Sequence, residues 1–424
     1  MKKRVVITGL GVVSPNGVGL DAFTFAIKNG VSGITHNAEL ERLQFSCQIT
    51  GTPDISDALK KQYFTDLELR NFNSTGILYG VIAGIDAWKD AGLTIKNNEN
   101  PDWDSGTIFG SGTSGIDKFR ESIYKIDALE TRKLGSTVVA QTMNSGVSAY
   151  LGGKLGLGNC VTTNSSACTT GTESILMAFD RIQAGKAKRI IAGSTSDSGP
   201  YIWGGFDAMR VCTYKHNQNP SEGSRPMSAS ASGFVPGSGA GAFVLEDLES
   251  ALARNARIYC EVLGGNVNSG GQRGLGTMTA PNPVAVKKCI VDALLNAAVN
   301  PHEIDLINGH LTATSKDSLE ILNWSEALNL KGKKFPYINS LKSMVGHCLS
   351  AAGSIEIVSC VLQLYNNFIF PNINCNDLNE EITAIIDKSK IPQTVIETKI
   401  NIVVKASFGF GDVNSCIVLK KIKL

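Results

Sequence analysis

The sequence lacks the features that would connect it with nucleic acids, membranes or an oxidising compartment. Lys and Arg number 40 and Asp and Glu 38, a net charge of +2, so no excess of positive charge favours nucleic-acid binding. No run approaches the roughly 18 apolar residues of a membrane span. The ten cysteines form no Cys-x-x-Cys pair, and scattered single cysteines are typical of buried thiols in a reducing compartment. We expect a cytoplasmic protein without a membrane, nucleic-acid or metal partner.

The N-terminus has a superficial likeness to a secretory signal. Basic residues at 2–4 precede an apolar stretch at 5–13. That stretch is short, Gly9 and Gly11 interrupt it, and no small-x-small cleavage site follows. A β-strand that enters a glycine-rich turn explains the pattern better.

Short β-branched segments alternate with amphipathic segments along the 424 residues. This alternation predicts an α/β fold with buried, largely parallel sheets. No low-complexity linker divides the chain, although its length exceeds that of one small domain. We expect strands at 5–8, 107–109, 189–192, 242–245, 304–308, 337–339 and 402–404, and helices at 75–90, 171–184 and 283–298.

Two segments in different parts of the chain share one pattern. In the first, a strand-like stretch at 159–163 leads through small residues to Cys168 and a helix with apolar residues on one face. In the second, a strand-like stretch at 337–339 leads to His347 and a similar helix. The pattern indicates a duplicated architecture with halves at 1–250 and 251–424.

Cys168 is a candidate nucleophile. Its neighbours are small and polar, and a helix is expected to begin beside it. Free N–H groups at a helix start favour an anion, so this position predicts a lowered thiol pKa and a site for the oxyanion of an attacked thioester. The alternative is a packed core thiol, which is the usual role of a lone buried cysteine. The segment by itself leaves both interpretations open.

Only five histidines are present, and His310 and His347 lie where a predicted strand passes into a loop of small residues. Two imidazole N–H groups can hydrogen-bond one carbonyl oxygen as it becomes an enolate, which a Claisen condensation requires. Either histidine alone would more often be a satisfied core residue. The presence of both at equivalent junctions favours the chemical role.

A glycine-rich segment at 110–115 fits the pattern Gly-x-Gly-x-x-Gly of dinucleotide sites. Such a site needs a second strand that ends in an acidic residue about 20 residues further on. The segment at 116–129 is typical of a charged helix instead. We therefore do not expect a nucleotide site.

Four segments in order carry a resemblance to a known family. These are residues 4–15, like the family's first strand; 166–171, like its nucleophile loop; 342–347 with 351–353, like its lysine–histidine motif; and 407–411, like its C-terminal phenylalanine loop. Over essentially its full length the chain resembles β-ketoacyl-acyl-carrier-protein synthases, most of all the type II elongation synthases. The resemblance implies a thiolase-like α/β fold of five layers, αβαβα, built from two similar halves, in a homodimer or a heterodimer.

The resemblance also implies a decarboxylative condensation. Cys168 would take an acyl group from acyl carrier protein, in an oxyanion hole formed by the backbone N–H groups of Cys168 and Phe410. His310 and His347 would hold the thioester carbonyl of malonyl-acyl carrier protein while decarboxylation builds the carbanion that attacks the acyl group. Phe410 would also be the gate for this second substrate. No cofactor is expected beyond the phosphopantetheine arm of the carrier.

The other assignments that the resemblance implies are supporting ones. Lys342 would support the two histidines and pair with Glu356. The remaining matches are Phe408 as a supporting residue of the phenylalanine loop, Thr312 and Thr314 as pantetheine contacts, Thr113 as a limit to acyl-pocket depth, and Arg210 as a carrier-docking residue.

Departures from the family pattern concentrate where the second substrate would bind. They are Leu311 in place of the usual glycine after His310, Asp317 one position early, and Asp412 and Val413 in place of glycine and threonine. The expected product therefore stays open between fatty acids and specialised polyenes or polyketides.

Two further classes of protein fit the sequence less well. A chain-length partner subunit binds acyl chains without condensing them, but such partners usually lack the nucleophilic cysteine that this chain keeps at Cys168. A degradative thiolase would use a second cysteine near the C-terminal loop, and residues 407–414 contain none.

Overall fold

The computed structural model describes residues 2–95 and 99–422, and its main strands form one large sheet that divides into two halves. The first half runs, in sheet order, β6 (Val161–Thr162), β5 (Ser105–Ser111), β7 (Arg189–Ser196), β8 (Gly239–Asp247) and β1 (Val5–Ser14). The second runs β11 (Tyr337–Asn339), β10 (Leu306–Asn308), β14 (Ile402–Gly409), β15 (Val413–Lys420) and β9 (Cys260–Ser269). The halves join where β1 and β9 pair antiparallel.

Both halves have the same strand order. Counted along the chain within each half, the sheet runs third, second, fourth, fifth, first. The second strand pairs in parallel with the third and fourth, and the fifth pairs antiparallel with the fourth and first. The predicted duplication is therefore confirmed. The expectation of largely parallel sheets was wrong, since β8 and β15 each run antiparallel to both of their neighbours and β1 pairs antiparallel with β9. For β15 the reason is its short connection from β14, which can join only antiparallel neighbours.

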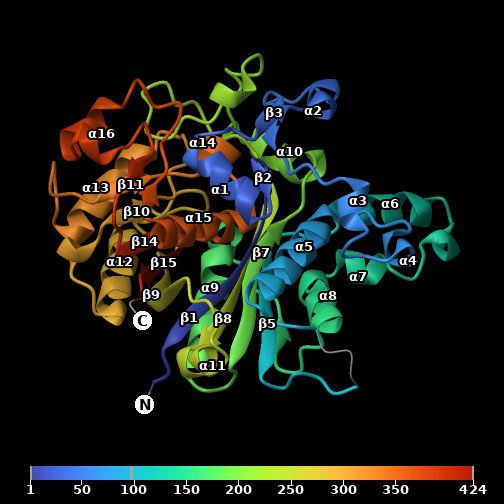
Figure 1. The fold of residues 1–424 in the computed structure, drawn as a ribbon. Helices are drawn as coiled ribbons and strands as arrows, with labels where there is room; N and C mark the ends of the chain where they lie inside the picture. The colour runs from blue at the N-terminus through green and yellow to red at the C-terminus, as the bar shows by residue number, and fades with distance from the viewer. Residues whose placement is uncertain (1, 96–98, 423–424) are drawn as a thin grey trace.

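Helices occupy a central layer and two outer layers around the half-sheets (Figure 1). The central layer is formed by α9 (Thr170–Gln183) and α15 (Ala352–Asn366), which contact strands of both halves. On the outside, α5 (Thr75–Asp90) and α8 (Gly146–Leu155) cover the first half, and α12 (Pro283–Ala297) with α13 (Asp317–Leu328) covers the second. Nearly every residue of α15 is buried, as a helix between two sheets requires. The five layers αβαβα agree with the predicted fold.

The two central helices touch through their backbones near their first turns. A Cβ atom at Gly171 would lie only 2.4 Å from the backbone nitrogen of Ser354, and one at Gly353 would lie 2.8 Å from the backbone of α9. Contacts this short are possible only where both positions lack a side chain. Cys168 precedes α9 and His347 precedes α15, so this contact brings together residues from the two halves.

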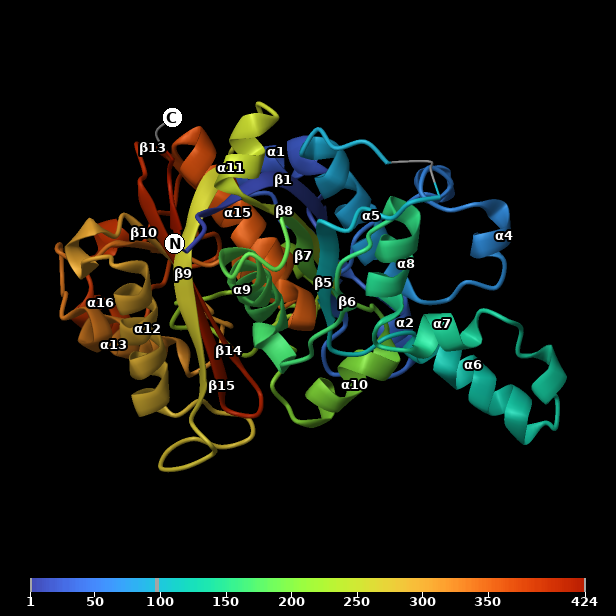
Figure 2. The same ribbon diagram turned by 90° about the horizontal axis from the view of Figure 1, so that it is seen from below.

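The remaining elements are additional to the five layers. In Figure 2, α6 (Ile116–Asp127) and α7 (Val138–Thr142) extend away from the body of the molecule. The others are β2 (Gly17–Val18), α1 (Leu20–Lys28), β3 (Ile34–His36), α2 (Ala38–Arg42), β4 (Ile49–Gly51), α3 (Asp57–Lys60), α4 (Asp66–Leu69), α10 (Pro200–Ala208), α11 (Leu248–Ala253), α14 (Lys342–Val345), β12 (Phe368–Ile369), α16 (Glu380–Ile385) and β13 (Ile396–Glu397). Within residues 2–95 and 99–422, no helix combines the length and the apolar character needed to cross a membrane.

Candidate active site

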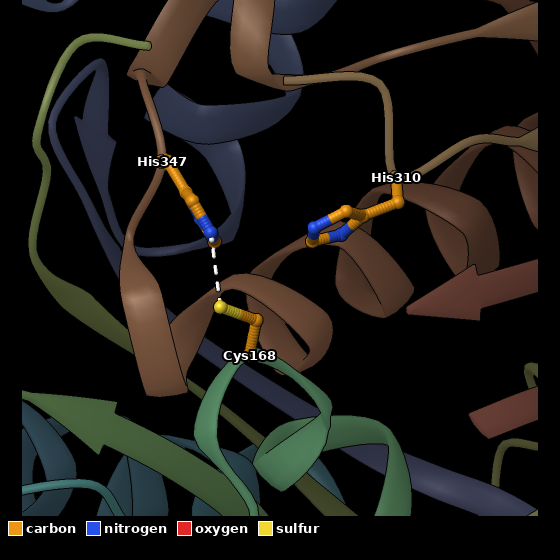
Figure 3. A group of neighbouring side chains, drawn as sticks. All are labelled: Cys168, His310 and His347. Atoms are coloured by element: carbon orange, nitrogen blue, oxygen red, sulfur yellow. Dashed lines mark hydrogen bonds between the residues drawn. The ribbon is translucent and has the colours of Figure 1, made fainter. Parts of the chain in front are cut away.

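Cys168 and His347 face each other where the two halves meet. Cys168 lies in a tight turn (Ala167–Thr169) at the start of α9, and His347 lies just before the turn (Leu349–Ala351) that leads into α15. The Sγ of Cys168 is 3.2 Å from the Nε2 of His347, and both side chains are buried (Figure 3). His310 reaches the same point from the loop that follows β10 (Figure 3).

The thiol of Cys168 does not have the lowered pKa that its position at a helix start predicted. Burial raises the pKa of Cys168 to about 11, because the dry surroundings disfavour the thiolate more than nearby groups favour it. The ammonium group of Lys342 and the backbone N–H groups of Phe410 and Cys168 act in the opposite direction. These two N–H groups therefore lie beside the sulfur, where the predicted oxyanion hole needs them.

The surroundings of His347 decide which ring nitrogen carries its proton. The backbone N–H of Leu349 lies 3.3 Å from Nδ1, and because a backbone N–H only donates, Nδ1 must accept. The proton of the neutral ring is therefore assigned to Nε2, which faces Cys168. Burial and the ammonium group of Lys342 hold the pKa of His347 well below its ordinary value, so the ring is neutral.

The proton of the His310 ring is assigned to Nε2 by the same reasoning. The Nζ of Lys342 lies 3.5 Å from Nδ1 of His310, and an ammonium group can only donate, so the ring proton belongs on Nε2. Burial, followed by Lys342, lowers the pKa of His310 well below its ordinary value. The two histidine rings are 5.3 Å apart between centres. Two neutral imidazoles thus offer N–H donors close to the sulfur.

A buried row of alternating charges lies behind His310. Glu356 of α15 pairs with Lys342, as the resemblance implied. Glu356 also pairs with Lys405 of β14, whose Nζ is 2.8 Å from Oε2 of the carboxylate. All three charged side chains are almost wholly buried. Sequence reasoning missed Lys405, although a single lysine within the apolar run 402–406 was an available signal.

Two buried carboxylates shape the loop that carries His310. Glu320 accepts the backbone N–H groups of His310 and Leu311, each at 2.7 Å. Asp317 accepts that of Thr312 at 2.9 Å. Burial raises the pKa of Asp317 to about 6 and that of Glu320 to about 7, against the effect of these donors. Sequence reasoning noted Asp317 only as a departure from the family and missed Glu320, although acids three residues apart after His310 were a signal.

A cavity of about 430 Å³ leads to the reacting centre. The hydroxyl groups of Thr312 and Thr314 lie 3.1 Å apart on its wall. The ring of Phe410 packs against Phe206, with 5.9 Å between centres. The predicted residues that line the cavity are Cys168, His310, His347, Thr312, Thr314, Phe408 and Phe410. The structure therefore brings the predicted nucleophile, histidines, gate and pantetheine contacts to one space.

Two predicted residues lie apart from the reacting centre. Thr113 is exposed and does not line this cavity; its backbone carbonyl accepts the hydroxyl of Ser111. Arg210 is exposed after the end of α10, directly before Val211, which does line the cavity. Arg210 thus lies near the cavity, whereas the acyl-pocket role of Thr113 stays a prediction.

The local geometry at the glycine-rich segment does not favour a nucleotide site. The glycine-rich segment 110–115 leads into the charged helix α6, and the N–H of Gly115 already donates to Asp197 at 2.6 Å. In the part of the chain that the structure describes, one nitrogen of each of His310 and His347 lies within 4.8 Å of the others and of the Cys168 sulfur, a spacing that a metal could use.

Comparison with protein families agrees with this arrangement. Residues 2–251 match the family described as Beta-ketoacyl synthase, N-terminal domain, and residues 259–376 match Beta-ketoacyl synthase, C-terminal domain. The chain belongs to the β-ketoacyl synthase family. The interval between the two matches lies between β8 and β9, where one half-sheet passes to the other.

Individual relatives extend over the whole chain. The sequence is 34% identical to 3-oxoacyl-acyl-carrier-protein synthase 1 of Buchnera aphidicola, with 99% of this chain and 100% of the relative covered. It is 32% identical to 3-oxoacyl-acyl-carrier-protein synthase 2 of Vibrio harveyi, with 99% of each covered. Among solved structures it is similar to the ishigamide ketosynthase/chain length factor, with a TM-score of 0.86, 26% identity and complete coverage of both chains. A type II polyketide ketosynthase in complex with its acyl-carrier protein, AntDE:AntF, gives the same TM-score and identity over 100% of both chains.

The raised pKa of Cys168 predicts how the thiol reacts with iodoacetamide. Because only the thiolate is alkylated, the rate constant for Cys168 should rise steadily between about pH 6 and about pH 10. Peptide mass spectrometry would follow the adduct, with Cys168→Ser as the control for the other cysteines. A rate constant that is already level near neutral pH would show a thiolate–imidazolium pair with His347 and contradict the neutral pair described above.

Proposed function

We propose that this chain catalyses the decarboxylative condensation of an acyl thioester, held on Cys168, with malonyl-acyl carrier protein to give β-ketoacyl-acyl carrier protein. The convergence of one thiol and two imidazole N–H donors at the inner end of a largely apolar cavity carries the proposal. The full-length similarity to proteins named 3-oxoacyl-acyl-carrier-protein synthases supports it. Fatty-acid elongation and specialised polyene or polyketide synthesis share this step.

In the first half-reaction, the Sγ of Cys168 attacks the thioester carbonyl of the acyl carrier. The backbone N–H groups of Cys168 and Phe410 receive the carbonyl oxygen as it becomes an oxyanion. When the tetrahedral intermediate collapses, the acyl group stays on Sγ. The pantetheine sulfur leaves with the electron pair and takes up the proton that the thiol released.

In the second half-reaction, malonyl carrier loses carbon dioxide. The bond between C2 and the carboxylate breaks, and its electron pair passes to C2 and the thioester oxygen. The Nε2–H groups of His310 and His347 donate to that oxygen and stabilise the enolate. C2 then attacks the acyl carbonyl on Cys168, and Sγ leaves as a thiolate that solvent reprotonates.

Residues along the cavity suit the handling of a pantetheine arm. From the cavity wall, the Thr312 and Thr314 hydroxyls would hydrogen-bond the amides of the arm. The Phe410 ring lies against Phe206 on the cavity wall, so movement of the Phe410 loop would widen the route to Cys168. No bound cofactor is required by these steps, since both substrates arrive on the carrier.

Two substitutions separate the half-reactions. Cys168→Ala removes the nucleophile, so intact-protein mass spectrometry should detect no acyl adduct after incubation with acyl carriers. His310→Ala should keep that adduct but slow malonyl-carrier decarboxylation by about a hundredfold or more, because one donor to the enolate is lost. Condensation by Cys168→Ala at the wild-type rate would overturn the proposal. Unchanged decarboxylation in His310→Ala would remove His310 from its role.

The same set of acyl carriers tests the alternative, a chain-length partner that binds acyl chains without condensing them. One similar solved structure is a ketosynthase/chain length factor pair, so the alternative has a structural basis. A partner of this kind would form no covalent adduct with any acyl carrier. The buried Cys168–His347 pair favours the catalyst.

The acyl carrier protein is proposed to dock at the mouth of the cavity. Lys316 is exposed and lines the cavity, and Arg210 is exposed beside the lining residue Val211. Two positive side chains at the rim would attract an acidic partner and raise its association rate. The position of Arg210 agrees with the docking role that the family resemblance implied.

Replacing Arg210 and Lys316 with alanine should therefore raise the KM for acyl carrier protein severalfold, leave kcat nearly unchanged and reduce the salt dependence. Steady-state kinetics at two salt concentrations would measure all three. An acyl N-acetylcysteamine thioester, which lacks the carrier, is the control substrate and should be used equally well by the variant. Equal losses with both substrates would argue against docking.

A second copy of the chain is proposed to cover one exposed apolar surface. Phe119, Ile123 and Tyr124 of α6 are exposed, as is Leu129 just beyond it, and β6 forms the end of the sheet. Large apolar side chains gathered on one projecting element are typical of protein interfaces. A homodimer buries them, whereas a heterodimer would need an unlike partner.

The joint change Phe119→Asp and Ile123→Asp should convert a dimer to a monomer, because two charges would be placed in an apolar contact. Size-exclusion chromatography with light scattering reports the mass. Phe25→Asp, on the exposed face of α1, is the matched control and should leave the mass unchanged. A monomeric wild-type protein, or a variant that stays dimeric, would contradict this assembly.

A further inference from the structure

Lys405 lies beside the reacting centre but has no part in the steps above. It belongs to β14, inside the second half-sheet, and its side chain is fully buried. Burying an ammonium group costs stability unless the charge is paired and its hydrogens find acceptors. The contacts of Lys405 therefore indicate what the residue does.

Oxygen atoms surround the Nζ of Lys405. It is 2.8 Å from Oε2 of Glu356 and 3.2 Å from the hydroxyl of Ser407, and it donates to the carbonyl of Ala406. A positive charge in this position is thus well compensated.

Glu356 is shared between two lysines. Its Oε1 accepts from Lys342, and its Oε2 faces Lys405. The second contact is one of charge, since Oε2 has no hydrogen bond of good geometry in the described chain. One carboxylate thus bridges two ammonium groups, and the first of these is the donor to Nδ1 of His310.

We propose that Lys405 is a positioning residue for the condensation, which acts through Glu356 and Lys342 on His310. With a cation on each side, Glu356 is held in one orientation, and Lys342 stays directed at His310. The hydrogen bond from Lys342 in turn keeps the His310 proton on Nε2, where the enolate needs it. The inference rests on the proposed condensation and adds a residue to it.

Lys405 also sets the charge of the site. Lys342 and Glu356 alone would form a neutral pair, whereas the three groups together carry one net positive charge. After burial and Lys342, and for His310 also His347, Lys405 further lowers the pKa of both His310 and His347. The same positive charge favours the enolate over the neutral thioester.

Other titratable groups share this environment. Burial lowers the pKa of Lys405 itself, and Glu356 acts against that. Burial raises the pKa of Glu320, and the charge of Lys405 partly opposes that rise. A change at Lys405 therefore affects the titration of Glu320 as well, which must be separated from that of the histidines. The groups that face Lys405 are Glu356 and Cys360 of α15, Lys342 of α14, Glu320 of α13, Cys416 of β15, and His310 and His347 of the loops.

The test is malonyl-carrier decarboxylation by Lys405→Met, measured as a function of pH. Methionine keeps the length of the side chain and removes the charge. Acyl loading of Cys168 should stay within about twofold of wild type, while decarboxylation falls about tenfold or more. Loss of the positive charge raises the pKa values of His310 and His347. Decarboxylation by Lys405→Met should therefore decline with falling pH at a pH about one unit higher than in the wild-type protein.

Matched variants distinguish this role from a structural one. Lys118 of α6 is also buried, bonded to Glu121 and to the carbonyl of Asn71, and lies outside the site. Lys118→Met should lower Tm without moving the acid limb of the pH profile. Lys405→Gln keeps a donor without the charge and should shift the limb even if Lys405→Met folds poorly. The shift should persist in a Glu320→Gln background.

Two results would overturn the proposal. One is an acid limb that coincides with wild type in both Lys405 variants. The other is an equal loss of acyl loading and decarboxylation, which would make Lys405 a general structural residue. A wild-type protein that fails to decarboxylate malonyl carrier would instead remove the proposed function, so the two failures can be told apart.

Discussion

The backbone contact between α9 and α15 is the constraint on which the site depends. Gly171 and Gly353 allow the two helices to pass closer than any side chain would permit. Each helix belongs to a different half of the chain, and each is preceded by a reactive residue. A methyl group at either glycine would clash with the backbone of the other helix, so the close approach that accompanies the 3.2 Å between Cys168 and His347 depends on both.

Burial has two consequences in this small space. It raises the pKa of the Cys168 thiol to about 11 and lowers the pKa of both histidines, so the resting groups are uncharged. Hydrogen bonds then decide the direction of each ring proton. Lys342 and the backbone of Leu349 supply donors to the two Nδ1 atoms, which leaves both Nε2–H groups directed at the cavity. The site is thus prepared to receive negative charge that appears only during reaction.

The duplicated architecture explains why the parts of the site come from distant positions. Both half-sheets have the same order, and in both a reactive residue precedes the central helix. The second half contributes three further residues to the site: the loop after β10 carries His310, and the hairpin β14–β15 carries Lys405 and Phe410. Carboxylates from two helices hold these groups: Glu320 accepts the backbone N–H of His310, and Glu356 pairs with Lys342 and Lys405.

The sequence by itself determined the fold class, the duplication and the reactive residues. Hydrophobic periodicity, small residues before two helices and the rarity of histidine are local properties, and they made Cys168, His310 and His347 candidates, whose roles the resemblance to a family then assigned. The supporting pair of Lys342 and Glu356 came from the resemblance to a family. Sheet direction was predicted less well, because β-branched runs look alike in parallel and antiparallel pairs.

Only the tertiary structure decided the charges and the protons of the site. The helix start at Cys168 predicted a lowered thiol pKa, but desolvation depends on atoms brought from both halves, and it reverses the direction. Lys405 lies in an apolar strand, and nothing near it in sequence shows that Glu356, 49 positions earlier, is its partner. Covalent order places residues along the chain, whereas electrostatic energies depend on distances between them and on the water that packing removes.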